Sequence, residues 1–126
     1  MGMIRKFLLP ESVAREDGAG AEIALEADCG KPLLLTLGID LSAEQESLEI
    51  SVWGSQDKSG WKLLQAFPQK FYCGTYSLPL DLTLYPEIRY LRAQWRMSRW
   101  GARQTAPIFG FYLAAQPWKA RAAGVA

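Results

Sequence analysis

Short stretches in which apolar and polar residues alternate, separated by turn residues, are the feature that most constrains how this chain can fold. The stretch "SLEISVW" places Leu48, Ile50 and Val52 on one face, because successive side chains of a strand point to opposite sides. The polar turn "GSQDKSG" follows it directly and is rich in residues that favour turns. No stretch has the sustained 3.6-residue period of an amphipathic helix. The pattern therefore predicts an all-β protein.

Similar strand signals recur at near-regular spacing along the rest of the chain. "LLLTLGI" is apolar on both faces except at Thr36, which is typical of a central strand or of a strand at an interface. Pro79 in "TYSLPLDL" indicates an edge strand or a bulge, because proline has no N–H to donate. About seven to eight strands predict an antiparallel β-sandwich or jelly roll. The other expected strands are "EIALEA", "WKLLQAF", "IRYLRAQWRM" and "PIFGFYLAA".

The chain is predicted to form one domain with a flexible segment at each end. With 126 residues it can bury enough surface to fold without a disulfide or a metal ion. Residues 1–21 combine a short apolar start with charged and small residues, which predicts a flexible N-terminal arm. The β-sandwich domain is expected over residues 22–117, followed by a flexible tail over residues 118–126.

Charge and composition argue against several functions. Fourteen Lys and Arg residues stand against thirteen Asp and Glu residues, a net charge of +1, so no overall field would draw the protein to nucleic acid or to an anionic membrane. The apolar run Phe7-Leu8-Leu9 is too short for a signal peptide or a membrane span. We therefore expect a cytoplasmic protein that binds no membrane, and we do not expect nucleic acid as its partner, with single-stranded nucleic acid only the third hypothesis for its ligand.

The sequence offers no pattern specific to catalysis. It contains no histidine, which is the side chain most used for acid–base chemistry near neutral pH and the commonest metal ligand. Cys29 and Cys73 lack a CxxC spacing, so we expect two buried free thiols and no metal or cofactor. The protein is thus interpreted as a non-enzyme. Asp28 beside Cys29, or Glu44 and Glu46, are the carboxylates that could serve as a base, but their spacing does not indicate a site. Asp57, Asp81 and Glu87 could act in glycoside hydrolysis only if they met in space.

The stretch "WRMSRWGAR" holds two indoles and three guanidinium groups within nine residues. In the expected strand "IRYLRAQWRM", which includes the start of this stretch, the alternation assigns Trp95 to the core and leaves Arg92 and Arg96 on the opposite face. There they either pair with Glu46 and Glu49 across the sheet, contributing about 0–1 kcal/mol each, or bind a ligand.

Binding residues are also expected in the loop after this strand and on the earlier strand "SLEISVW". Arg99, Trp100 and Arg103 fall in a segment marked as a loop by Gly101 and Pro107. There they either bind a ligand or close the end of the sandwich. Trp53 lies on the polar face of its strand and would join Arg92 and Arg96 in an aromatic and basic platform if the two strands are neighbours.

The middle of the chain resembles discoidin, or galactose-binding-like, β-sandwich domains. The resemblance rests on "LEISVWGSQDKSGWKLLQAF" and "IRYLRAQWR", about residues 47–67 and 88–96: a strand, a Gly-Ser-Asp turn, a Trp that opens the next strand, and a late "YLR" strand. It implies a β-sandwich whose end loops hold sugars or lipid head groups. A similar arrangement in accessory domains of phage structural proteins implies assembly instead.

Two functions remain open from the sequence. The first is a non-catalytic β-sandwich that self-associates or docks into a larger assembly through an aromatic and Arg-rich face, since Trp, Tyr and Arg are enriched at interfaces. The second is a carbohydrate-binding module that uses loop Trp and Arg residues. The candidate binding residues for both are Trp53, Arg92, Arg96, Arg99, Trp100 and Arg103.

Overall fold

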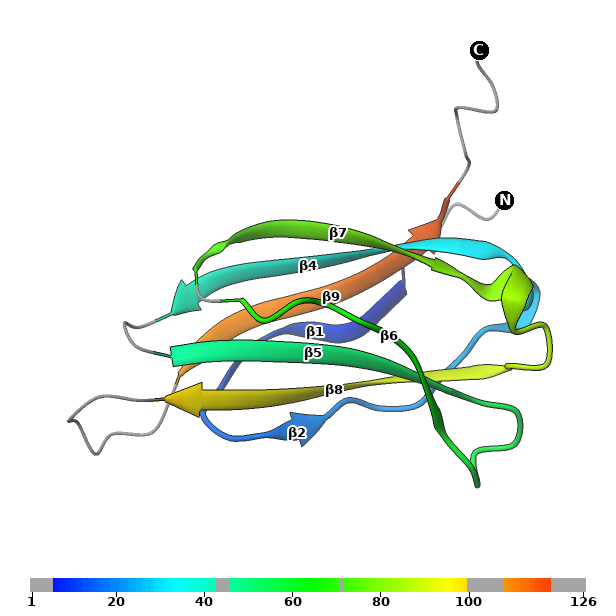
Figure 1. Ribbon diagram of the computed structural model, residues 1–126, viewed down its shortest axis with the longest axis horizontal. Coiled ribbons are helices and arrows are strands. Elements are labelled where there is room, and N and C mark those ends of the chain that lie inside the picture. The colour runs from blue at the N-terminus through cyan, green and yellow to red at the C-terminus, as the bar shows by residue number, and fades with distance from the viewer. Residues whose placement is uncertain (1–5, 43–45, 71, 100–107, 119–126) are drawn as a thin grey trace, which may run out of the picture.

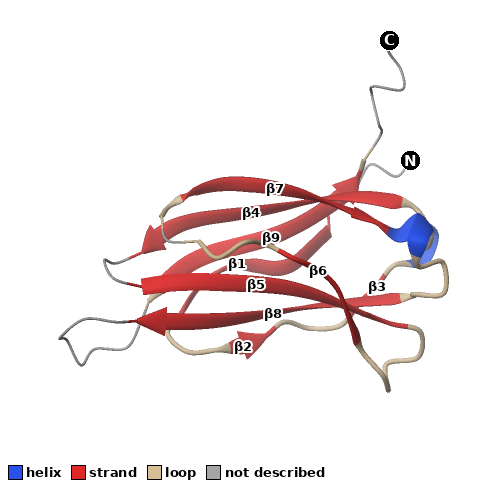
Figure 2. Ribbon diagram, in the orientation of Figure 1, coloured by secondary structure: helices blue, strands red, loops and turns tan. Residues whose placement is uncertain are grey.

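Two antiparallel sheets packed face to face make up this protein (Figure 1). The computed structural model describes residues 6–42, 46–70, 72–99 and 108–118. Within these ranges there are nine strands and no α-helix (Figure 2). Two short 3-10 helices are present, η1 (Glu26–Asp28) and η2 (Leu82–Leu84). The prediction of an all-β antiparallel sandwich is confirmed.

The first sheet has four strands in the order β1-β9-β4-β7. The apolar stretch "LLLTLGI" lies in β4, which pairs with β7 on one side and with β9 on the other, as expected for a central strand. Pro79 lies in β7 at the edge of the sheet, where its missing N–H is tolerated. The bounds are β1 (Lys6–Ala14), β4 (Pro32–Ser42), β7 (Gly74–Asp81) and β9 (Phe109–Pro117).

The second sheet has five strands, with β8 and β5 at its centre. Their pairing joins the two cleanest alternating stretches of the sequence side by side over their whole length. The expected strand "EIALEA" is shorter than its alternation predicts, because the chain enters η1 at Glu26, whose φ is 52°. The bounds are β2 (Gly18–Ala19), β3 (Ile23–Ala24), β5 (Glu46–Ser55), β6 (Lys62–Ala66) and β8 (Tyr90–Arg99).

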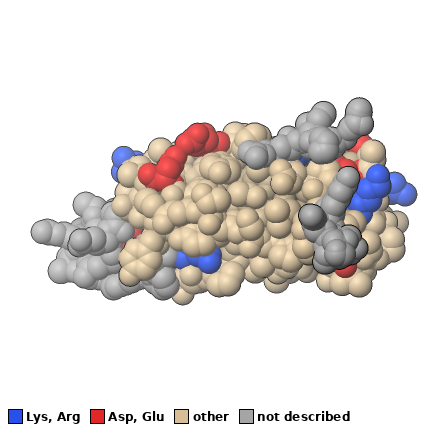
Figure 3. Space-filling model, turned by 90° about the horizontal axis from the view of Figure 1, so that it is seen from above, with Lys and Arg blue, Asp and Glu red and all other residues tan. Residues whose placement is uncertain are grey.

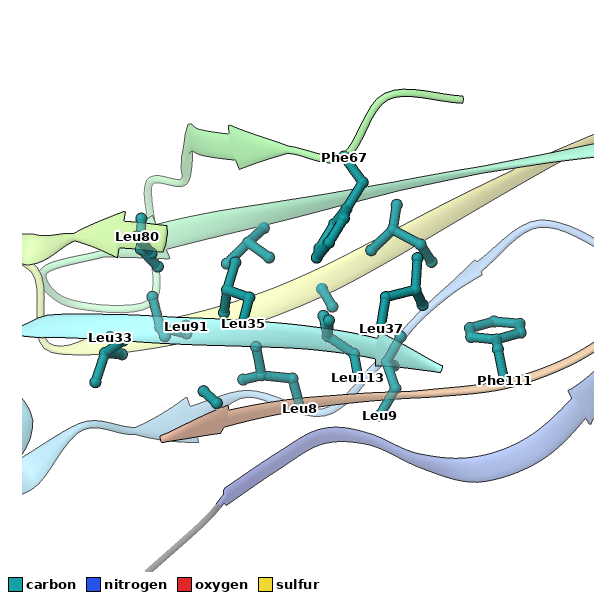
Figure 4. Packing of buried hydrophobic residues seen from close by; sticks show 14 of the residues in the cluster. Leu8, Leu9, Leu33, Leu35, Leu37, Phe67, Leu80, Leu91, Phe111 and Leu113 are labelled. Carbon is teal, nitrogen blue, oxygen red and sulfur yellow. The ribbon is translucent and has the colours of Figure 1, made fainter. Parts of the chain in front are cut away.

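The core lies between the sheets and is built from the inward positions of each strand (Figure 4). Leu35 and Leu37 of β4 and Ile50 of β5 belong to this cluster, and all three are at most 1% exposed. Phe109 and Phe111 contribute the largest buried side chains from β9. Burial of apolar area of this kind is the main force that holds two sheets together.

The expectation of a flexible arm over residues 1–21 is wrong for the part that the structure describes. Residues 6–14 form β1, which pairs with β9 from Lys6 opposite Ala115 to Ala14 opposite Phe109. Leu8 and Leu9 are 2% and 5% exposed and belong to the core. A β-bulge and Pro10 interrupt the alternation, which hid the strand from a search for a two-residue period. The sandwich therefore begins before Glu22, and of the expected tail only Trp118 is described.

The turn that joins β5 to β6 is organised by two side chains. Ser55 is 1% exposed, and its Oγ accepts hydrogen bonds from the N–H groups of Asp57 at 3.2 Å and Lys58 at 2.7 Å. Asp57 accepts from both the N–H and the hydroxyl of Ser59, each at 2.9 Å. These bonds, the backbone one first, hold the pKa of Asp57 below its usual value.

We expect Asp57→Ala to lower stability most at neutral pH. A carboxyl group whose folded-state pKa is depressed stabilises the fold above its unfolded pKa, and this contribution is lost as the pH falls through the folded-state value. The difference in melting temperature between the wild type and the variant should therefore shrink below about pH 4. Thermal unfolding followed by circular dichroism at several pH values measures this difference in melting temperature. A difference that stays constant down to low pH would contradict this role of the carboxylate.

Candidate functional site

The outer face of the five-stranded sheet brings together three of the residues expected to bind. In the register of β5 and β8, Trp53 lies directly opposite Arg92, and Glu49 lies directly opposite Arg96. Directly opposite residues share a face. Trp53, Arg92 and Arg96 thus lie on one surface, together with Ser51 and Gln94, which also pair with each other. We call this surface the Trp53 face.

The indole of Trp53 is held in a fixed orientation on this face. Its Nε1 donates a 2.9 Å hydrogen bond to Oγ of Ser51, two residues earlier in β5. Leu63 of β6 lies opposite Trp53 on the other side and is 50% exposed. Because its one polar atom is already bonded within the sheet, the half-buried indole presents apolar surface to a ligand.

A hollow of about 420 Å³ opens beside Trp53. Its apolar side includes Trp53 and Leu63, and hydrogen-bonding side chains line the rest. Those side chains are Glu49, Ser51, Gln69, Gln94 and Arg96. One carboxylate and one guanidinium offset each other, so the lining carries no net formal charge. The hollow therefore combines an aromatic surface with several neutral donors and acceptors.

Arg92 is packed differently from Arg96. Its guanidinium carbon lies 5.8 Å from the centroid of the Trp61 ring, and the side chain is half-buried. The Nε atom of Arg92 is buried and has no hydrogen-bond partner. Arg96 is exposed at the hollow. The contact with Trp61 thus holds the side chain of Arg92 in place on this face, whereas the exposed side chain of Arg96 can bind a ligand in the hollow.

The expected pairing of Glu46 across the outer face is wrong. Glu46 shares the inward parity of Leu48 and Ile50, is 1% exposed, and accepts a 2.9 Å hydrogen bond from the N–H of Ile108. The sequence does not fix the position of Glu46 relative to the start of β5, because the clear alternation of "SLEISVW" begins only at Ser47. Glu49 does lie opposite Arg96.

Of the other expected binding residues, the structure describes only Arg99. Arg99 is the last residue of β8, and its backbone pairs with Glu46. Trp100 and Arg103 lie outside the described residues. Two residues of the hollow, Gln69 and Gln94, were not predicted. Gln94 shares the two-residue period of Arg92 and Arg96 and could have been found from it, whereas Gln69 follows Pro68 and carries no periodic signal.

Of the carboxylates considered for catalysis, Glu44 lies outside the described residues, and those considered for glycoside hydrolysis each have a separate partner. Asp57 organises its own turn, Asp81 caps η2 by accepting from the N–H of Thr83 at 3.0 Å, and Glu87 pairs with Lys62 at 3.5 Å. Both thiols are free as predicted, but Cys29 is half-buried and Cys73 is exposed, so the expectation of two buried thiols is wrong. In the described ranges, no three His, Cys, Asp or Glu residues are grouped so as to hold a metal ion.

The chain was compared with protein-family models and with curated proteins. No protein-family model matches the chain, and no curated protein matches it. The described part of the chain also contains no helix long and apolar enough to cross a membrane. Functional inference therefore rests on the surfaces themselves.

Proposed function

We propose that this protein is a non-catalytic carbohydrate-binding domain that holds its ligand in the hollow on the Trp53 face. The observation that supports this most is the combination of a fixed, half-buried indole with neutral hydrogen-bonding side chains around about 420 Å³ of space. A sugar ring has an apolar face of C–H groups and a rim of hydroxyl groups. On the Trp53 face, the indole matches the apolar face of the sugar, and the polar side chains around the hollow match its hydroxyl groups.

The roles of the residues follow from their positions. The indole of Trp53 stacks on the apolar face of the sugar. Gln69 and Gln94 each offer a donor and an acceptor to hydroxyl groups. Arg96 donates to ring or hydroxyl oxygens, and Glu49 accepts from hydroxyl groups. The resemblance to galactose-binding-like sandwiches favours the same ligand class, although those domains bind through end loops and this hollow lies on a sheet face.

The proposal predicts a large loss of glycan binding in Trp53→Ala. Truncation of a central Trp at a binding surface costs about 2 kcal/mol or more, so the affinity should fall about thirtyfold. A glycan array with the wild type identifies a bound oligosaccharide, and titration calorimetry with that oligosaccharide compares the variants. Trp118→Ala is the matched control, because Trp118 is 39% exposed and lies outside the hollow. A wild type that binds no glycan, or equal affinities in Trp53→Ala and wild type, would contradict the proposal.

Self-association through the same face is the second candidate function. Leu63 is 50% exposed beside Trp53 and Arg92, and an aromatic, Arg-bearing patch with an exposed leucine resembles the centre of a protein interface. A symmetric dimer could place Glu49 of one copy against Arg96 of the other. Light scattering after size exclusion, over a range of protein and salt concentrations, tests this with Leu63→Glu. A wild type that stays monomeric at every concentration would exclude it.

A further inference from the structure

A second hollow lies on the opposite side of the molecule, on the outer face of the four-stranded sheet. Phe7 of β1 and Tyr112 of β9 are in edge-to-face contact, with ring centroids 6.0 Å apart and planes at 70°. Together with Pro10 and Glu11 they line a space of about 300 Å³. Two nearly perpendicular aromatic rings, a proline ring and a carboxylate thus form a corner open to solvent. We call these four residues the Phe7–Tyr112 corner.

Two glycines make this corner possible. Gly38 of β4 lies beneath Tyr112, and a Cβ atom at position 38 would overlap the tyrosine ring. Gly110 lies between β1 and β4, and a Cβ there would come within 2.7 Å of a carboxylate oxygen of Asp40. The absence of side chains at these two positions leaves room for the ring to lie across β4 and for Asp40 to reach over β9.

Glu11 and Asp40 bring two carboxylates close to this corner, and no ion pair among the described residues includes either of them. Asp40 meets Glu11 over Gly110, and the hydrogen bond between the two side chains, followed by their mutual repulsion, raises the pKa of Glu11 above its usual value. The ion pairs among the described residues join Lys6 to Asp28, Lys58 to Glu22 and Lys62 to Glu87, and none reaches either carboxylate. A cation placed here would relieve this repulsion.

The neighbouring surface does not repel a cation. Outward positions of β4 and β9 beside the corner are uncharged: Leu34, Thr36, Ala114 and Gln116. Figure 3, which looks at the molecule from above Figure 1, where β4 and β7 lie uppermost, shows mostly uncharged residues on the described part of this face, with Lys and Arg in small separate patches. Phe7 is 45% exposed, so its ring is accessible.

We propose that the Phe7–Tyr112 corner binds a small organic ammonium group of the choline type. The faces of aromatic rings attract a cation through their quadrupole, and methylated ammonium groups are the ligands that combine apolar contact with charge. The space of about 300 Å³ accommodates such a group with its substituents. Glu11, supported by Asp40, supplies the charge, and Phe7 and Tyr112 supply the walls. This site is on the other sheet from the Trp53 face, so it is independent of the proposed glycan binding.

The test uses choline as the probe and 3,3-dimethyl-1-butanol as its neutral counterpart of the same shape. Two-dimensional NMR of the full chain, titrated with each compound at constant ionic strength, measures affinity and location together. We expect saturable millimolar binding of choline, with shifts centred on Phe7, Glu11 and Tyr112. Loss of one ring in Phe7→Leu should weaken binding about two- to fivefold. Loss of one charge in Glu11→Gln should weaken it about fivefold. Glu49→Gln, the same change on the opposite sheet, should leave it unchanged.

Each other outcome overturns the proposal. Equal binding of the neutral alcohol would show an unselective apolar hollow. Equal loss in Glu49→Gln and Glu11→Gln would show a general charge effect rather than a site. Shifts that do not saturate, or that centre away from the corner, would show that no ammonium site exists there. The NMR spectrum of each variant without ligand reports whether it is folded, so a misfolded variant is recognised, and Asp40→Asn then replaces it as the charge test.

Discussion

Leu8→Ala is expected to destabilise the protein by about 2–5 kcal/mol, because removal of a fully buried leucine loses its burial energy and leaves a cavity. Leu8 is 2% exposed and projects from β1 into the core (Figure 4). A loss of this size is a large fraction of the 5–15 kcal/mol that typically separates folded from unfolded domains. Urea unfolding followed by tryptophan fluorescence measures the free energy of unfolding of each variant.

The matched control for this prediction lies in the same strand. Val13 belongs to β1 but is 58% exposed, so Val13→Ala should change stability by no more than about 0.5 kcal/mol. If Leu8→Ala were as mild as Val13→Ala, β1 would be a loosely attached arm after all. The two variants together therefore decide whether the first described residues are part of the sandwich.

Trp95→Ala is expected to cost about 3 kcal/mol, in the range found for truncation of large aromatic side chains. Trp95 of β8 packs edge to face on Phe111 of β9, with centroids 5.6 Å apart, and so links the two sheets. Its Nε1 also donates a 2.8 Å hydrogen bond to the carbonyl of Glu16 in the connection between β1 and β2. A Cβ on Gly18 would meet this ring at 2.5 Å, which shows how closely the connection lies against it.

A conservative substitution separates the two contributions of Trp95. Trp95→Phe keeps a ring against Phe111 but loses the N–H, so we expect a loss of about 1 kcal/mol from the hydrogen bond. Hydrogen exchange followed by NMR reports on the connection as well as on global stability. The backbone N–H of Met97, which donates to Asp17 at 2.7 Å, should exchange faster in both variants. Equal stability of Trp95→Ala and wild type would show that the indole does not join the sheets.

The alternation in the sequence identified the strands that lie in the middle of the sheets, because each of them has one clearly apolar face. It placed Leu91 and Trp95 inward and Arg92 outward correctly. The same rule failed for β1, where irregular pairing and a proline break the period. It also failed for Glu46, a buried charged residue that accepts a hydrogen bond from the backbone of Ile108, just before β9. Local pattern does not report such long-range partners.

The binding surfaces were predictable only in part, for a related reason. Trp53, Arg92 and Arg96 could be grouped because they follow a period, and the pairing of β5 with β8 brings them together. The hollow beside them also needs Gln69, which follows β6. Nothing in the sequence pointed to the Phe7–Tyr112 corner, because it depends on the pairing of β1 with β9 across most of the chain.

The pairing of β1 with β9 also sets the order of events when the chain is made. The strand at residues 6–14 emerges from the ribosome well before its partner at residues 109–117. At a synthesis rate of about 5–20 residues per second, about 5–20 s pass before the strand that pairs with β1 has been made. During that time Leu8 and Leu9 lack their native neighbours. We therefore expect growing chains that are delayed between these two strands to be prone to aggregation.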